Sequence, residues 1–142
     1  MKKIEIKITF FSVLLFTIYL CIISCNLGVS NTILEQVISP DEQYTIYVFT
    51  RDAGATTGFN TQVSIKKNRE LLKNKEGNTF ICDLNHISVG NEKKYAQGGP
   101  KLSLNWITNN DLAIYYPKGI RIYKQESTIY TIKIKYYEDQ ES

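Results

Sequence analysis

The sequence predicts an all-β fold, namely a single small antiparallel β-sandwich or open barrel of about seven strands, preceded by an N-terminal signal helix. Three observations predict it. Short apolar stretches with a period of two recur from residue 43 onward, Gly, Asn, Asp and Pro residues separate them, and no amphipathic helical pattern occurs after residue 32. Short strands at regular spacing with turns between them are typical of sandwiches and small barrels. One β-rich domain is therefore expected over residues 32–142.

The first elements of this domain differ in how clearly they are predicted. Residues 43–51 have apolar or aromatic side chains on both alternating sides, so this strand is expected to be central and covered on both faces. Residues 33–38 are too few to distinguish a strand from a helical turn. Residues 61–66 alternate apolar with polar side chains, which predicts a strand with one face in solvent.

The remaining strands follow from the same alternation. Glycines and threonines predict a loop over residues 52–58, and the glycine-containing polar stretch at 85–100 predicts a long second loop. The outward lysines of the last strand suit an exposed face or an edge. The other predicted strands are residues 79–83, 102–106, 112–116, 120–123 and 130–137.

The N-terminal segment has the layout of an export signal. Residues 1–7 carry three lysines and one glutamate, and the 16 residues from Ile8 to Ile23 carry no charge. Ser24, a small residue, then precedes Cys25. A basic start, an apolar core and a small residue before the cleavage point are the parts of a secretory signal.

Cys25 directly after Ser24 resembles the lipobox of bacterial lipoproteins. The resemblance implies a signal peptide over 1–24, an acylated (palmitate-type) Cys25, a lipidated tether over 25–31, and a protein held on the extracytoplasmic face of the cell membrane. An uncleaved anchor is the alternative, although 16 residues fall short of the roughly 20 that a spanning helix needs. Cys21 follows the bulky Leu20 and is a poorer candidate for the modified thiol.

A second resemblance extends from about Ile38 to Tyr116. The chain is similar there to a family of small bacterial lipoproteins and secreted proteins classed only as a domain of unknown function. Because that family carries no assigned activity, the resemblance transfers no catalytic or binding residue. The segments that carry it are Ser39-Pro40-Asp41, 44–49, Gly54-Ala55-Thr56-Thr57, 62–65 and 77–80.

Composition argues against several functions. Without residues 1–24 the chain has 118 residues with 14 basic and 13 acidic side chains, a net charge of +1 that would not steer nucleic acid. One histidine and one remaining cysteine cannot supply a zinc site, and no phosphate-binding glycine motif occurs. We therefore predict no metal, no cofactor and no nucleic-acid partner, and assign no catalytic residue.

One loop is a candidate binding site. It combines a charged pair, a glycine that permits close backbone approach, and hydrogen-bonding side chains, which would suit a small polar ligand. The alternative is a wide hairpin connection whose side chains satisfy the amides of the loop itself. The residues are Arg51, Asp52, Gly54, Thr56, Thr57 and Asn60.

The cysteine of the mature domain and its tyrosines each allow two interpretations. Cys82 lies in an apolar stretch and is expected to be a small core residue, whereas a Cys82/His86 pair would make a thiol nucleophile. Four tyrosines are expected in the core, namely Tyr44, Tyr116, Tyr130 and Tyr136. Four others form either an aromatic surface or the packing face of a second layer, namely Tyr47, Tyr115, Tyr123 and Tyr137.

The favoured function is therefore a non-catalytic, membrane-anchored binding or interaction module, with an envelope protein or glycan as its partner. A small thiol-dependent enzyme using Cys82 and His86 and a purely structural envelope protein are the alternatives.

Overall fold

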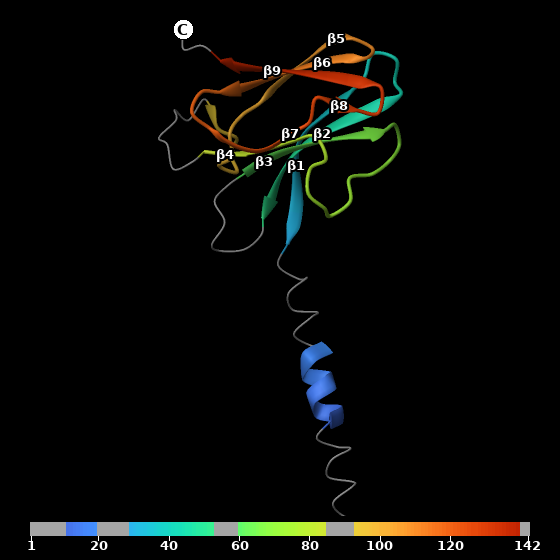
Figure 1. Cartoon of the computed structure of the whole chain (residues 1–142), viewed down its shortest axis with the longest axis vertical. Helices are drawn as coiled ribbons and strands as arrows, with labels where there is room; N and C mark the ends of the chain where they lie inside the picture. Colours follow the sequence, from blue (N-terminus) through green and yellow to red (C-terminus); the bar gives the residue numbers. More distant parts are fainter. Residues whose placement is uncertain (1–10, 20–28, 53–59, 85–92, 140–142) are drawn as a thin grey trace, which may run out of the picture.

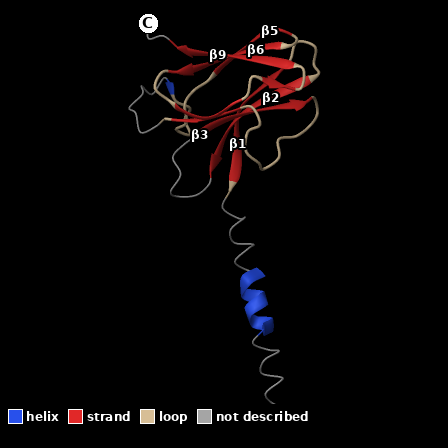
Figure 2. Ribbon diagram, viewed as in Figure 1, coloured by secondary structure: helices blue, strands red, loops and turns tan. Residues whose placement is uncertain are grey.

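The domain is a sandwich of two β-sheets (Figures 1 and 2). The computed structural model describes residues 11–19, 29–52, 60–84 and 93–139. Nine strands occur in these ranges, compared with the seven or so expected, and they form two separate sheets. The all-β sandwich expected from the alternating apolar pattern is confirmed, and the strands of the described residues form no closed barrel.

The first sheet has five strands and the second has four. The order in the first sheet is β1 (Ser30–Ile38), β2 (Tyr44–Asp52), β3 (Asn60–Lys67), β4 (Phe80–Asp83) and β7 (Arg121–Gln125). The order in the second sheet is β5 (Ser103–Thr108), β6 (Asp111–Pro117), β9 (Ile132–Asp139) and β8 (Thr128–Ile129). Neighbouring strands are antiparallel except β6 and β9, which run parallel.

The hydrophobic core lies between the sheets because alternate residues of each strand point inward. From the first sheet come Ile46, Val48, Val63, Ile65, Phe80 and Cys82, all fully buried. From the second sheet come Leu112, Ile114, Ile132 and Ile134. β2 is buried on both faces over its first six residues, as its doubly apolar pattern predicts.

The outer face of β3 is buried, which corrects the expectation of a solvent-facing side. Gln62 and Ser64 are only 4% and 1% exposed. The chain between β3 and β4 folds back over this face, and the amides of Gly77 and Asn78 donate hydrogen bonds to the Gln62 and Ser64 side chains over 2.7 and 3.2 Å. Polar side chains are therefore buried here because the connection supplies their partners.

The first and the last of the predicted elements, residues 33–38 and 130–137, also differ from the structure. Residues 33–38 belong to a strand, β1, which begins at Ser30, so the last two residues of the expected tether lie in the sheet. The predicted strand 130–137 begins only at Ile132, in β9, because Tyr130 adopts a left-handed conformation with φ 54° in the turn that joins β8 to β9. Tyr130 is 48% exposed, which corrects its expected place in the core.

Residues 11–19 form a short helix of the expected apolar segment, with Phe11 and Phe16 more than 60% exposed (blue in Figure 1). Of the helices in the described ranges, none has the length and apolar character required to cross a membrane.

Candidate functional site

The predicted binding loop is described only at its two ends. Arg51 and Asp52 end β2, Asn60 begins β3, and Gly54, Thr56 and Thr57 lie outside the described residues. The structure therefore places three of the six candidate residues.

Asn60 closes the hairpin instead of facing a ligand. Its side-chain oxygen accepts a hydrogen bond from the Arg51 amide over 3.2 Å, and its side-chain nitrogen donates to the Arg51 carbonyl over 2.8 Å. Gln62 also donates to the Asn60 side-chain oxygen over 3.1 Å. These bonds support the interpretation of the loop ends as a hairpin connection that satisfies its own polar groups.

The Arg51 side chain also has a structural role. Its Nη1 donates to the side-chain oxygens of Asn31, over 2.8 Å, and Asn74, over 3.0 Å. Arg51 thereby joins the beginning of β1 to the connection between β3 and β4, so its guanidinium is not a free ligand-binding group.

Cys82 is a core residue, as its apolar sequence context predicts. Its side chain is fully buried and its thiol donates to the Thr61 carbonyl over 3.5 Å. Burial, with a smaller contribution from the charge of Asp83, raises the pKa of the Cys82 thiol far above its usual range. A thiol that stays protonated and inaccessible is a poor nucleophile. His86 lies outside the described residues.

Cys82→Ala is expected to lower the free energy of unfolding by about 1–2 kcal/mol, because it leaves a small cavity. Alkylation of Cys82 in the folded protein at neutral pH should be slow and should become fast in denaturant, as followed by peptide mass spectrometry. Rapid labelling of Cys82 in the folded protein would contradict a buried, protonated thiol.

The tyrosines divide differently from the sequence prediction. Tyr44, Tyr116 and Tyr136 do contact the core. Tyr47 is 5% exposed beneath the β3–β4 connection, where its hydroxyl donates to the Glu70 carbonyl over 3.2 Å. Only Tyr115 and Tyr137, of the four tyrosines on the opposite sides, lie together at the surface.

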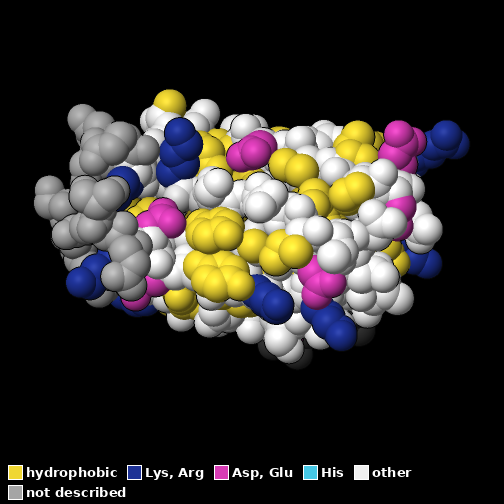
Figure 3. All heavy atoms as spheres, turned by 90° about the horizontal axis from the view of Figure 1, so that it is seen from above, with side chains coloured by type: hydrophobic (Ala, Val, Ile, Leu, Met, Phe, Trp, Pro, Cys, Tyr) yellow, Lys and Arg dark blue, Asp and Glu magenta, His cyan; other side chains and the backbone are white. Residues whose placement is uncertain are grey.

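The outer face of the second sheet carries this tyrosine pair. Tyr115 on β6 and Tyr137 on β9 are in register, and their rings stack with centroids 5.1 Å apart. Hydrophobic side chains gather near the middle of this face, with Lys or Arg side chains beside them (Figure 3). We name this surface the tyrosine face. Its residues are Ser103, Asn105, Tyr115, Lys133, Lys135 and Tyr137.

The strand register places the polar residues of the tyrosine face next to the two tyrosines. Ser103 pairs with Tyr115 across β5 and β6, and Lys135 precedes Tyr137 by two residues on the same side of β9. Lys133 and Lys135 are exposed, and neither takes part in an ion pair with another described residue. The tyrosine face thus offers two phenol rings with their hydroxyls, the hydroxyl of Ser103, the amide of Asn105 and two positive charges on one side of the sheet.

A cluster that the sequence did not predict lies on β4 and β7. Arg121 donates to both carboxylate oxygens of Asp83, over 3.1 and 2.6 Å, and the Tyr123 hydroxyl donates to the same carboxylate over 2.7 Å. These hydrogen bonds raise the pKa of both Arg121 and Tyr123. The cluster ties Tyr123 to an ion pair, so Tyr123 is not part of the tyrosine face.

The comparisons with known proteins place the chain in a family. A family model described as a family of unknown function (DUF5412) matches residues 1–117. The chain belongs to this family. The DUF5412 match includes the N-terminal apolar segment and extends to the end of β6. No curated protein and no solved structure matches the chain. Membership in DUF5412 agrees with the expected family of unknown function, and its function has to be inferred from geometry.

Proposed function

We propose that this DUF5412 protein is a lipoprotein, anchored at the extracytoplasmic face of the membrane through Cys25, whose β-sandwich is a non-catalytic module that binds an envelope glycan on the tyrosine face. The observation that carries the binding role is the stacked pair on the outer face of the second sheet, in which Tyr115 is half-buried and Tyr137 is 42% exposed.

The anchor is supported by the N-terminal sequence and by the place where the fold begins. The apolar side chains of residues 11–19 project into solvent instead of joining the domain core, as suits a segment that acts only in export. β1 begins at Ser30, five residues after Cys25. A lipid on Cys25 would therefore hold the sandwich close to the bilayer through a short stretch of chain.

A binding role is favoured over thiol catalysis because Cys82 is buried and its pKa is raised. Arg51 and Asn60 of the candidate loop hold the hairpin together, which favours a structural role for both residues.

A glycan fits the tyrosine face better than a protein. Large contiguous apolar patches mark many protein interaction sites, whereas here two rings are surrounded by polar and charged residues. Sugars bind through their CH groups on aromatic rings and through hydrogen bonds to neighbouring polar groups, which Ser103, Asn105 and Lys135 supply. Lys133 and Lys135 would favour a glycan that carries negative charge.

Tyr115→Ala and Tyr137→Ala are each expected to weaken binding to purified peptidoglycan sacculi about tenfold, since an aromatic contact contributes up to about 1.5 kcal/mol. The bound fraction is measured by co-sedimentation, and thermal melts are recorded on the same proteins. Both side chains lie on the outer face, so the melting temperature should change little.

Tyr123→Ala is the matched control, because Tyr123 is 58% exposed but lies on the first sheet. It should bind sacculi as the wild type does. Wild-type protein that does not sediment with sacculi, or equal binding by all three variants, would contradict a glycan site on the tyrosine face.

A further inference from the structure

The beginning of β1 is fastened to one turn of the β3–β4 connection. The Asn31 side-chain nitrogen donates to the carbonyls of Lys73, over 3.1 Å, and Lys75, over 2.8 Å. The Asn74 side-chain nitrogen donates in return to the Val29 carbonyl over 2.7 Å. We name Lys73–Lys75 the basal turn. Its backbone position is fixed relative to the point where the chain enters the domain.

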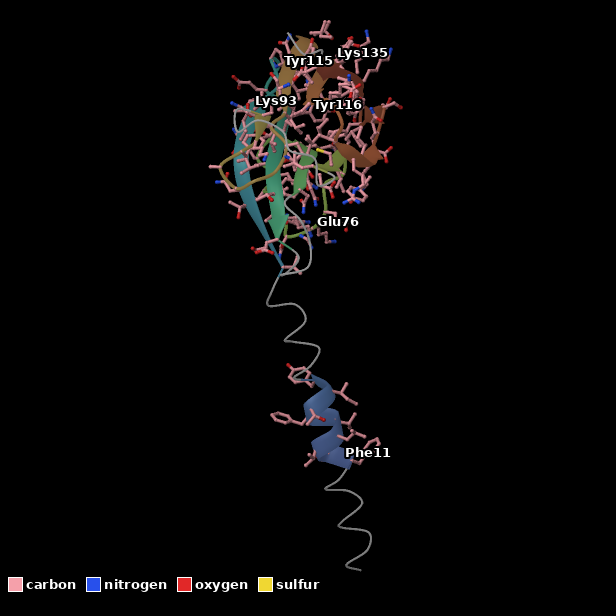
Figure 4. The ribbon with its side chains drawn as sticks, turned by 90° about the vertical axis from the view of Figure 1, so that its left-hand side faces the viewer. Phe11, Glu76, Lys93, Tyr115, Tyr116 and Lys135 are labelled. Atoms are coloured by element: carbon pink, nitrogen blue, oxygen red, sulfur yellow. The ribbon has the colours of Figure 1, made fainter. Side chains whose placement is uncertain are left out.

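Arg51, at the end of β2, adds further hydrogen bonds between the beginning of β1 and the basal turn. Its guanidinium bridges the side chains of Asn31 and Asn74, and Asn60 holds its backbone. The basal turn, the beginning of β1 and the end of β2 therefore form one hydrogen-bonded unit. Glu76, which follows the turn, lies at the lower end of the domain in Figure 4, where β1 also begins in Figure 1.

The length of chain between the lipid site and this unit is short. Three residues lie between Cys25 and Val29, and the four Cα–Cα steps that join them span at most about 14 Å when fully extended. If Cys25 carries the lipid, as the proposed function states, the basal turn cannot lie far from the headgroups.

The chemistry of the turn suits that position. Lys73 and Lys75 are exposed, and neither belongs to the ion pairs found in the described part of the chain. Leu71, two residues before Lys73, is 78% exposed, more than any other large apolar side chain among the residues that the structure describes. An exposed leucine beside flexible lysines is typical of segments at a membrane interface.

We propose that the basal turn rests on the bilayer, with Lys73 and Lys75 binding anionic lipid headgroups and Leu71 entering the interface. This inference rests on the proposed lipid anchor at Cys25. Docking of the basal turn would fix the orientation of the domain relative to the membrane, because the second sheet lies at the end of the domain opposite the beginning of β1 (Figure 1). The tyrosine face then points away from the membrane, toward the envelope.

The test uses the lipidated protein, purified from the membranes of cells that express the full chain and reconstituted into vesicles. One set of vesicles contains phosphatidylcholine alone, and the other contains phosphatidylcholine with anionic phosphatidylglycerol. Amide hydrogen exchange over residues 69–76 is followed by mass spectrometry. We expect slower exchange on the anionic vesicles, by about fivefold for each lysine engaged, and loss of the difference in high salt.

Lys73→Gln combined with Lys75→Gln should abolish the difference between the two kinds of vesicle. Lys133→Gln combined with Lys135→Gln, on the tyrosine face, is the matched control and should retain it. Identical exchange of the wild type on both vesicles, or equal loss in both double variants, would overturn docking of the basal turn.

The intact mass of the protein and its flotation with the vesicles distinguish a failure of basal-turn docking from a failure of the lipid anchor. Protein that carries lipid and floats with the vesicles, but shows no dependence on anionic lipid, overturns the docking and leaves the anchor standing. Protein that carries no lipid overturns both.

Discussion

Phe80→Ala is expected to lower the free energy of unfolding by about 3–5 kcal/mol, because it leaves a cavity where the two sheets pack together. Phe80 is fully buried on β4, and its ring centroid lies 5.7 Å from that of Tyr116 and 5.2 Å from that of Tyr136, both in the second sheet. Urea unfolding followed by circular dichroism measures the loss.

Tyr123→Ala, an aromatic truncation on the neighbouring strand β7, is the comparison for Phe80→Ala because the Tyr123 side chain is largely exposed. It should cost well below half as much. A loss of less than about 1 kcal/mol for Phe80→Ala would mean that β4 does not pack against the second sheet as described.

Gly77→Ala is expected to destabilise the domain by about 3 kcal/mol, because a side chain has no room at this position. A Cβ atom on Gly77 would lie 2.8 Å from the Val63 carbonyl oxygen and 3.2 Å from that of Phe80. These oxygens belong to the backbones of β3 and β4, which cannot move without disturbing both strands. A displacement of Gly77 would also strain the hydrogen bond from its amide to the Gln62 side chain. Thermal and urea unfolding both report the change.

Glu76→Ala is the neighbouring control, since Glu76 is exposed and its replacement should change the free energy of unfolding by no more than about 0.5 kcal/mol. If Gly77→Ala proved as harmless as Glu76→Ala, the β3–β4 connection would not press on β3 as closely as the structure shows.

The elements with a strong local pattern were predictable from the sequence. β2 has apolar residues on both sides and is buried on both faces, and the alternating stretches that become β5 and β6 were also anticipated. The outer face of β3 was not, because the burial of Gln62 and Ser64 depends on hydrogen bonds to residues 15 and 14 positions away. The turn at Tyr130 was missed because a tyrosine with positive φ has no compositional signal.

The candidate site was predictable only in part, for the same reason. Alternation placed Tyr115 and Tyr137 on outward sides of their strands, but only the parallel pairing of β6 with β9 brings the two rings together. Asp83 and Arg121 are 38 residues apart and meet through the pairing of β4 with β7. Arg51 and Asn60 were singled out for binding, whereas the structure assigns both to the hairpin and to the fastening of β1.

The most direct test of the account is the intact mass of the protein purified from the membranes of a bacterial host that expresses the full chain. We expect a polypeptide that begins at Cys25 and carries a diacylglyceryl group on that residue, and a Cys25→Ala variant that keeps residues 1–24 and gains no lipid. Wild-type protein that retains residues 1–24 and carries no lipid would contradict the lipid anchor at Cys25.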